Sequence, residues 1–191
     1  MTGLPTPSQT VGPFFSIGLC PNALSHLVPD RRSPAAKVVS VEGRLVDGEG
    51  APVPDAILEI WRADENGEYA APGNEGSENG QGVPAGFARI TVSEQGEFAF
   101  STVKPGSRRE PGGAVQAPHL VVLIFMRGLL MHLATRIYFS DEAANGEDAV
   151  LRLVPQDRRQ TLMAVYAPDK ANLFRWDVRL QGAQETVFFA T

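Results

Sequence analysis

The sequence predicts an all-β fold, a β-sandwich of mixed and antiparallel strands, and three observations support this. Short segments rich in Val, Ile, Leu, Phe and Thr recur along most of the chain, separated by clusters of Gly, Pro, Asn and Asp. The longest apolar segment, residues 120–125 (LVVLIF), suits one buried strand and is far too short for a membrane helix. With 191 residues, 43% of them hydrophobic, the chain can form one sizeable core.

We expect an N-terminal arm over residues 1–36 and a single sandwich domain over residues 37–191. The first segment is rich in proline and has no sustained hydrophobic period, which is typical of an extended segment lying on another surface. Gly12-Pro13 predicts a turn inside it, followed by two phenylalanines that would be exposed on a free arm. The pattern leaves open whether the arm packs on its own domain or contacts a partner.

The segments after the arm have the composition or alternation of strands, and they are residues 37–47, 56–64, 87–92, 97–103, 120–125, 131–139, 161–168, 173–181 and 186–191. The first two predict a hairpin-like pair, because Gly- and Pro-rich residues join them. Residues 141–154 predict one short helical excursion, and the polar residues 64–86 predict a long loop.

The central strand carries a histidine at its start and an arginine just past its end. Because strand side chains alternate, one face of this strand carries His119, Val121, Leu123, Phe125 and Arg127. A histidine that begins a buried strand raises the question of a metal ligand. A histidine hydrogen-bonded at a strand end is the alternative, and the pattern alone favours it.

Composition excludes several classes of function. The chain has 22 acidic and 17 basic residues with no long block of either sign, which disfavours nucleic acid and anionic membranes as partners. One cysteine, Cys20, excludes an intrachain disulfide, and the N-terminus lacks the pattern of a signal peptide, so the cytoplasm is expected. There is no GxSxG motif and no phosphate-binding loop. The chain has three histidines, His26, His119 and His132, so a metal site built from this chain alone would need nearly all of them or would need oxygen ligands.

A set of motifs in a fixed order spans nearly the whole chain. They are TPSQTVGPFF, DGEGAPVPDAILEIWRADENGEY, FSTVKPG, APHLVVLIFMRG, TRIYFSDEAAN and FRWDVRLQGAQETVFF. In combination they resemble the intradiol ring-cleaving dioxygenases. In that family the iron-bearing chain holds ferric iron with two tyrosines and two histidines.

Carried over residue by residue, the resemblance supplies half of this ligand set. Tyr69, in WRADENGEY, matches the first tyrosine and His119 matches the first histidine. Arg108 stands where the second tyrosine would be, and Val121 where the second histidine would be. A guanidinium is always protonated and offers no lone pair, and a valine offers only hydrocarbon. The resemblance therefore implies that this chain binds no metal and that its ligand positions are vestigial.

The resemblance also implies a partner, an iron-bearing chain of the same fold, with an active site at the seam between the two chains. Ferric iron in the partner would be the cofactor, with no nicotinamide or flavin. The substrate-binding residues expected from this chain are Thr10, Gly12, Pro13, Phe14 and Arg127. The arginine would bind a carboxylate on an aromatic substrate through two parallel hydrogen bonds. Arg136 is a weaker candidate, and Arg108 and Arg109 are expected in a solvated loop or in an ion pair with Glu110.

Two further hypotheses stay open at this point. One is a self-sufficient dioxygenase in which His132 or Tyr138 replaces a missing ligand. The other is a transthyretin-like β-sandwich binding or structural module without an enzymatic role, suggested by the strand–turn–strand pattern around residues 43–61. The exposed aromatic residues of the arm argue against an isolated module.

Overall fold

The structure is a computed structural model that describes residues 6–20, 37–70 and 86–190. Strands dominate these residues. In chain order, the elements are α1 (Phe15–Leu19), β1 (Val38–Val46), β2 (Ile57–Arg62), β3 (Phe87–Thr91), β4 (Glu97–Val103), β5 (Arg108–Arg109), β6 (Val115–Gln116), β7 (His119–Phe125), β8 (Leu133–Phe139), η1 (Ala143–Glu147), η2 (Leu151–Leu153), η3 (Arg159–Leu162), β9 (Met163–Tyr166), β10 (Leu173–Arg175) and β11 (Val178–Arg179).

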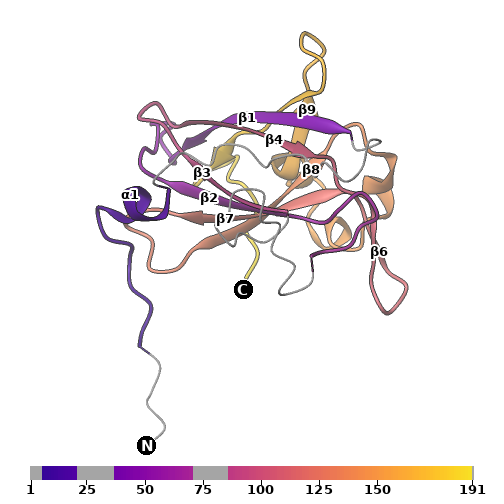
Figure 1. Cartoon of the computed structure of the whole chain (residues 1–191), viewed down its shortest axis with the longest axis horizontal. Helices are drawn as coiled ribbons and strands as arrows, with labels where there is room; N and C mark the ends of the chain where they lie inside the picture. The colour runs from indigo at the N-terminus through magenta and orange to yellow at the C-terminus, as the bar shows by residue number, and fades with distance from the viewer. Residues whose placement is uncertain (1–5, 21–36, 71–85, 191) are drawn as a thin grey trace, which may run out of the picture.

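The main sheet curves until its two halves face each other (Figure 1). Its hydrogen-bonded order is β11-β1-β10-β9-β8-β7-β2-β3, and β4 pairs with β1. Most pairs are antiparallel, but β1 runs parallel to β10 and β11, and β8 runs parallel to β9. β7 lies between β2 and β8, as expected for a central strand. The all-β sandwich of mixed strands is thereby confirmed.

Alternation along β7 determines which side chains enter the core. Leu120, Val122 and Ile124 are fully buried and belong to the main core cluster between the two halves. The intervening Val121 and Leu123 are half-buried on the outer face. Burying an aliphatic side chain of this size stabilises the fold by about 1.5–3 kcal/mol. The predicted separation of the two faces is confirmed, and the outer face is the one that carries His119.

The predicted hairpin between residues 37–47 and 56–64 is wrong. β1 pairs with β4, β10 and β11, whereas β2 pairs with β3 and β7. The intervening turn closes on itself through a bridge between Val46 and Pro52, and the chain then crosses to the other half of the sandwich. A Gly- and Pro-rich turn serves a hairpin and a crossover equally well, so local sequence does not distinguish them.

The C-terminal strands also differ from the prediction. Residues 173–181 form two short strands, β10 and β11, because β1 pairs with each in turn on either side of Trp176. Residues 161–168 begin as the 3-10 helix η3 before β9. Residues 186–190 form no strand, and Phe189 makes an isolated bridge with Ala134.

Helical structure is more frequent than predicted. The excursion over residues 141–154 is present as η1 and η2, but η3 and the arm helix α1 were not predicted. The arm is therefore not extended throughout. Residues 1–5 and 21–36 of the arm, His26, and residues 71–85 of the predicted loop lie outside the described residues. Within the part of the chain that the structure describes, no helix has the length and apolar character needed to cross a bilayer.

One glycine in β1 marks an unusually close approach of two backbones. A Cβ atom added to Gly43 would lie 1.7 Å from the carbonyl oxygen of Trp176 and 2.9 Å from the Phe98 ring. The same approach lets the backbone N–H of Trp176 donate to the carbonyl of Glu42 at 3.0 Å. The strand can pass this point only because residue 43 has no side chain.

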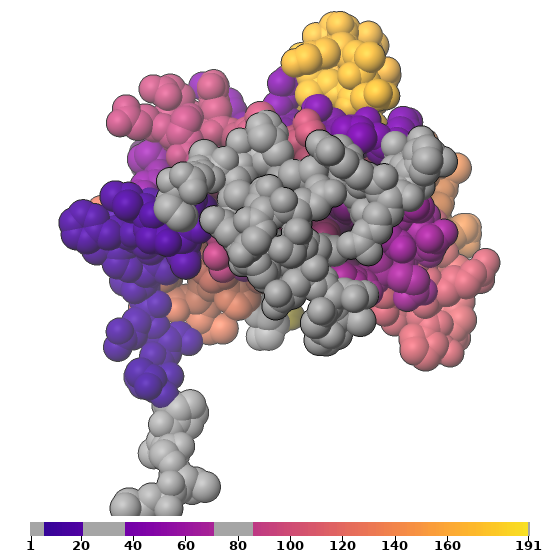
Figure 2. All heavy atoms as spheres, in the orientation of Figure 1, coloured from indigo at the N-terminus to yellow at the C-terminus, as the bar shows by residue number. Residues whose placement is uncertain are grey.

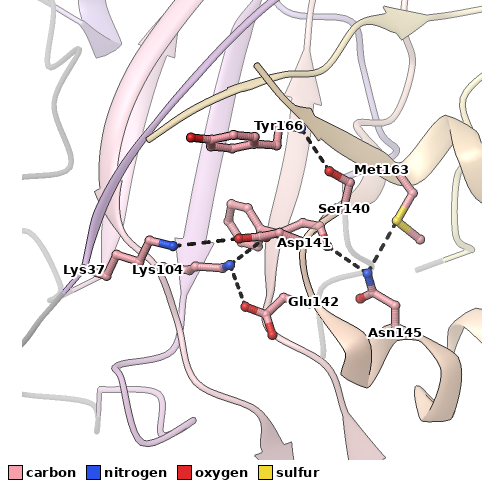
Figure 3. A network of polar contacts seen from close by, with 9 residues as sticks. Lys37, Lys104, Ser140, Asp141, Glu142, Asn145, Met163 and Tyr166 are labelled. Carbon is pink, nitrogen blue, oxygen red and sulfur yellow. Dashed lines mark hydrogen bonds and ion pairs between the residues drawn. The ribbon is translucent and has the colours of Figure 1, made fainter. Parts of the chain in front are cut away.

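Lys104 joins the end of β4 to the end of β8 (Figure 3). Its ammonium pairs with Asp141 at 2.7 Å and Glu142 at 2.5 Å, and its side chain is only 8% exposed. The same nitrogen lies 5.1 Å from the ring centre of Phe139 and 5.6 Å from that of Phe174, a cation–π arrangement. This lysine begins the Lys-Pro-Gly turn and so anchors the loop that carries Arg108.

Candidate functional site

Two polar clusters lie at opposite ends of β7. The first, here the start cluster, surrounds the beginning of β7 and contains Tyr69, Arg108, Glu110, Gln116, His119, Arg136 and Tyr138. The second, here the arm cluster, surrounds the end of β7 and contains Thr10, Ser16, Asp55, Arg127 and Gly128. In Figure 1, β6 lies beside the first and α1 marks the second, on opposite sides of the molecule.

Two glycines bring Tyr69 and Arg108 together. The N–H of Gly106 donates to the carbonyl of Asp64 at 2.9 Å, and a Cβ atom at Gly106 would lie 2.2 Å from the carbonyl oxygen of Glu65. Gly67 has a φ of +85°, in the left-handed region that favours glycine, and its Cβ would also meet backbone. The two turns therefore touch backbone to backbone, and the Arg108 Cζ lies 5.2 Å from the Tyr69 ring centre.

A chain of hydrogen bonds runs through the start cluster. Arg108 Nε donates to Glu110 Oε1 at 2.9 Å, and the Gln116 side-chain amide donates to the same oxygen at 2.7 Å. Gln116 Oε1 accepts from an Arg136 terminal nitrogen at 2.7 Å, and that nitrogen also lies 3.3 Å from the Tyr138 hydroxyl. The expected ion pair between Arg108 and Glu110 is thus present, and the guanidinium groups of Arg108 and Arg136 both lie at the start of β7.

His119 is 5% exposed and hydrogen-bonded at the strand end. Its Nδ1 lies 2.7 Å from the carbonyl oxygen of Ala117, which can only accept, so Nδ1 carries the proton in the neutral ring. Burial, and secondly the nearby Arg136 guanidinium, lowers the pKa of His119 from 6.5 to about 4. The imidazole is therefore neutral at neutral pH.

The stability of the chain is expected to fall in mild acid because of His119. The unfolded chain binds a proton on this histidine below its ordinary pKa of 6.5, whereas the folded chain binds it only below about 4. As the pH falls from 6.5 to 4, the free energy of unfolding decreases by about 3 kcal/mol in total. Below that range this contribution no longer changes with pH. Urea unfolding of the wild type and of His119→Gln across this pH range measures the effect. Equal pH slopes for the two proteins would contradict it.

The start cluster does not fit a ferric ion. The two remaining candidate donors, a phenol and an imidazole, face two guanidinium groups, and fixed cations oppose a trivalent cation at short range. Burial raises the pKa of Tyr69, which keeps it a neutral phenol. Among the described residues, no group of three or more His, Cys, Asp or Glu side chains could hold a metal ion.

The two residues considered as substitute ligands do not complete the set. The Tyr138 hydroxyl donates to the buried Asp148 at 3.2 Å and accepts from Arg136 at 3.3 Å, and burial raises the pKa of Tyr138. His132 lies at the opposite end of β7, where its ring centre is 5.4 Å from that of Phe125. Among the residues that the structure describes, the positions of these two side chains therefore give no support to a self-sufficient iron site.

The arm cluster ties the arm to the loop between β7 and β8. The backbone N–H of Gly128 donates to Thr10 Oγ1 at 2.8 Å, and the Ser16 hydroxyl donates to Asp55 Oδ1 at 2.6 Å. Arg127 Nε pairs with the other oxygen of Asp55 at 3.3 Å, while the arginine side chain remains 59% exposed. Arg127 thus presents a guanidinium at the surface beside the arm.

Large apolar side chains surround this cluster and face solvent. Phe14 is 74% exposed and Ile17 is 68% exposed on the arm, and Leu130 and Met131 are exposed on the neighbouring loop. A hollow of about 260 Å³ separates the arm from this loop and is lined by Ser8, Gln9, Val11, Phe125, Met126, Leu129, Leu130, Met131 and His132. Figure 2 shows the arm at the margin of the molecule, reaching past the sandwich. Apolar groups gathered around a polar centre are typical of a surface that a partner covers.

The structure divides the predicted site residues into two groups. Thr10 and Arg127 are neighbours in the arm cluster, and Gly12, Pro13 and Phe14 are exposed on the same arm segment. The positions that the resemblance matches to metal ligands, Tyr69, Arg108, His119 and Val121, lie at the start of β7, and Arg136 joins them opposite Val121. Arg109 is exposed in β5 and pairs through its backbone with Val115.

Sequence reasoning missed three residues that organise the clusters. They are Asp55, Gln116 and Asp148, and each contacts residues far from it in sequence. Asp55 lies in a Pro-rich turn, where an aspartate is expected for local reasons. Its positive φ of 59° is a conformation that a sequence does not reveal.

The chain is similar to known proteins in both sequence and fold. A family model described as "Dioxygenase" matches residues 11–182. The chain is 42% identical over 196 residues to the protocatechuate 3,4-dioxygenase alpha chain of Burkholderia cepacia, covering 96% of each chain. It is 24% identical to the beta chain from the same organism, over 80% of this chain and 68% of that one. Its fold is similar to that of 3-chlorocatechol 1,2-dioxygenase from Rhodococcus opacus 1CP, with a TM-score of 0.63, 21% identity, and coverage of 94% and 68%.

Proposed function

The chain belongs to the intradiol dioxygenase family, and from that premise we propose that it is the non-iron-binding alpha chain of a protocatechuate 3,4-dioxygenase. In this proposal a beta chain of the same fold holds ferric iron. The active site lies at the interface between the two chains, and the alpha chain lines part of it. Residues 37–191 form the single sandwich domain and residues 1–36 the arm.

The separation of the two clusters is the observation that supports this most strongly. The candidate substrate-binding residues gather at the end of β7. The vestigial ligand positions lie at its start, where Arg108 and Arg136 are connected by hydrogen bonds through Glu110 and Gln116. If the arm and Arg127 contact a substrate, the metal for that substrate has to come from another chain. The exposed side chains of Phe14 and Met131 give the seam an apolar surface to bury.

The reaction would add both atoms of dioxygen across the bond between the two hydroxyl-bearing carbons of protocatechuate, giving 3-carboxy-cis,cis-muconate. Iron in the beta chain would supply the activation of the catechol. This chain would orient and enclose the ring, with Thr10, Gly12, Pro13 and Phe14 as the wall and Arg127 as the binding group for the carboxylate. The family match argues against a transthyretin-like module without an enzymatic role.

Arg127→Ala tests this assignment in the mixed assembly, meaning this chain together with an iron-bearing beta chain. The KM for protocatechuate is expected to rise about tenfold or more, because a hydrogen-bonded charge pair contributes at least about 1.5 kcal/mol. The KM for unsubstituted catechol should change much less, since that ring has no carboxylate. Steady-state oxygen uptake with both substrates, at equal iron content, is the measurement.

A matched control is Arg44→Ala, which removes an arginine of similar exposure that pairs with Glu97 at 3.4 Å on β1 and β4. It should leave both KM values unchanged. Equal changes for the two substrates in Arg127→Ala would remove this arginine from the pocket. Stoichiometric iron bound by the chain expressed alone would contradict the proposal as a whole.

A further inference from the structure

We infer that Asp55 is a positioning residue that fixes Arg127 and the arm as one unit, so that the arginine offers its terminal nitrogens to the substrate carboxylate. The inference rests on the proposed function and deepens it. Asp55 itself would not touch the substrate. Through Arg127 it would increase the preference of the enzyme for catechols that carry a carboxylate over unsubstituted catechol.

Each oxygen of the Asp55 carboxylate contacts a different segment of the chain. Oδ1 accepts from Ser16 Oγ, in α1 of the arm, at 2.6 Å, and Oδ2 pairs with Arg127 Nε, after β7, at 3.3 Å. One residue further, the backbone N–H of Gly128 donates to Thr10 Oγ1 at 2.8 Å. The arm and the β7–β8 loop are therefore joined at two points. One is the hydrogen bond between Gly128 and Thr10, and the other is the charged carboxylate of Asp55.

The backbone of Asp55 indicates that this placement is specific. Its φ of 59° lies in the left-handed region, which Asn172 also adopts among the described non-glycine residues. This conformation is unfavourable for most side chains and least so for Asp and Asn, and it persists where surrounding contacts maintain it. The contacts here are the two partners of the carboxylate, whose side chain is 29% exposed.

The geometry also determines how Arg127 can bind a second carboxylate. A guanidinium has five N–H donors, and the Asp55 pair is made through Nε. A substrate carboxylate would then be bound end-on, by the two terminal nitrogens, and the aromatic ring would be held along the axis of the arginine. Without Asp55 the guanidinium could rotate and bind in other orientations.

Asp55→Asn in the mixed assembly is the test, because asparagine tolerates the left-handed backbone and keeps one acceptor oxygen while losing the charge. The KM for protocatechuate is expected to rise about three- to fivefold, while kcat and the KM for catechol stay within about twofold. In the background of Arg127→Ala, the same substitution should have no further effect on KM. A purely structural role would instead change kcat, both substrates, or the thermal stability of the assembly.

Asp169→Asn is the matched control, since it removes an ion pair of the same type with Arg175, at 3.0 Å, in the β9–β10 turn. It should leave the preference for protocatechuate unchanged. An unchanged KM in Asp55→Asn, or an additive effect with Arg127→Ala, would overturn the inference while leaving the proposed function intact. Loss of the effect of Arg127→Ala itself would overturn the proposed function.

Discussion

Gly43→Ala is expected to destabilise the chain by about 3 kcal/mol or more, because the added methyl group has no space to occupy. Its carbon would lie 1.7 Å from the Trp176 carbonyl oxygen and 2.7 Å from the carbonyl carbon. Both are backbone atoms, so a change of rotamer cannot relieve the clash. Instead, β1 has to move away from the backbone at Trp176, between β10 and β11. That separation would also break the hydrogen bond from Trp176 to Glu42.

Thermal unfolding monitored by circular dichroism measures this effect. For a domain of this size, about 3 kcal/mol corresponds to a decrease in Tm of about 6–12 °C. Gly146→Ala is the matched control, because an added Cβ there meets nothing within 4 Å and its φ is not positive. The control should keep the wild-type Tm. Equal stability of the two variants would show that β1 does not approach Trp176 this closely.

Asp148→Ala is expected to cost about 3 kcal/mol or more in the free energy of unfolding. The carboxylate is 1% exposed and accepts from the backbone N–H groups of Ala117, Val150 and Leu151 at 2.7, 2.9 and 2.7 Å. It also accepts from the Tyr138 hydroxyl at 3.2 Å. Alanine would remove this acceptor from three buried donors, those of Ala117, Leu151 and Tyr138, and from the part-buried N–H of Val150.

Asp148→Asn separates the loss of hydrogen bonds from the loss of volume. Its amide oxygen can take the place of Oδ1, which accepts from Tyr138, Val150 and Leu151, while its NH₂ group would face the N–H of Ala117. Asparagine should therefore destabilise the chain less than alanine does. Denaturant titrations of both variants decide this, and equal loss in the two would contradict the hydrogen-bond account.

Much of the fold could be predicted from the sequence because alternation and turn residues are local. The alternation of β7 follows from the spacing of Leu120, Val122 and Ile124, and the strands from β1 to β4 lie within a residue of the expected bounds at most ends. Pairing could not be predicted in the same way. Which strand lies beside β1 depends on residues 173–179, which are distant in sequence.

For the candidate site, too, the identities of the residues could be predicted from the sequence, but the contacts between distant segments could not. The sequence motifs alone place Arg108 and Val121 at positions that the family resemblance matches to metal ligands, and neither side chain can ligate a metal. The chain of contacts from Arg108 to Asp148 could not be predicted, because it joins four segments of the chain. Asp55 illustrates the same limit, since its two partners are 39 residues before it and 72 residues after it.

The parallel pairing of β1 with β10 and β11 has a consequence for biosynthesis. β1 leaves the ribosome before β10 and β11, the strands that cover one of its edges, have been made. Until then the nascent chain carries an open strand edge, which can pair with other chains. A ribosome that stops before residue 173 would release a product unable to close its sandwich.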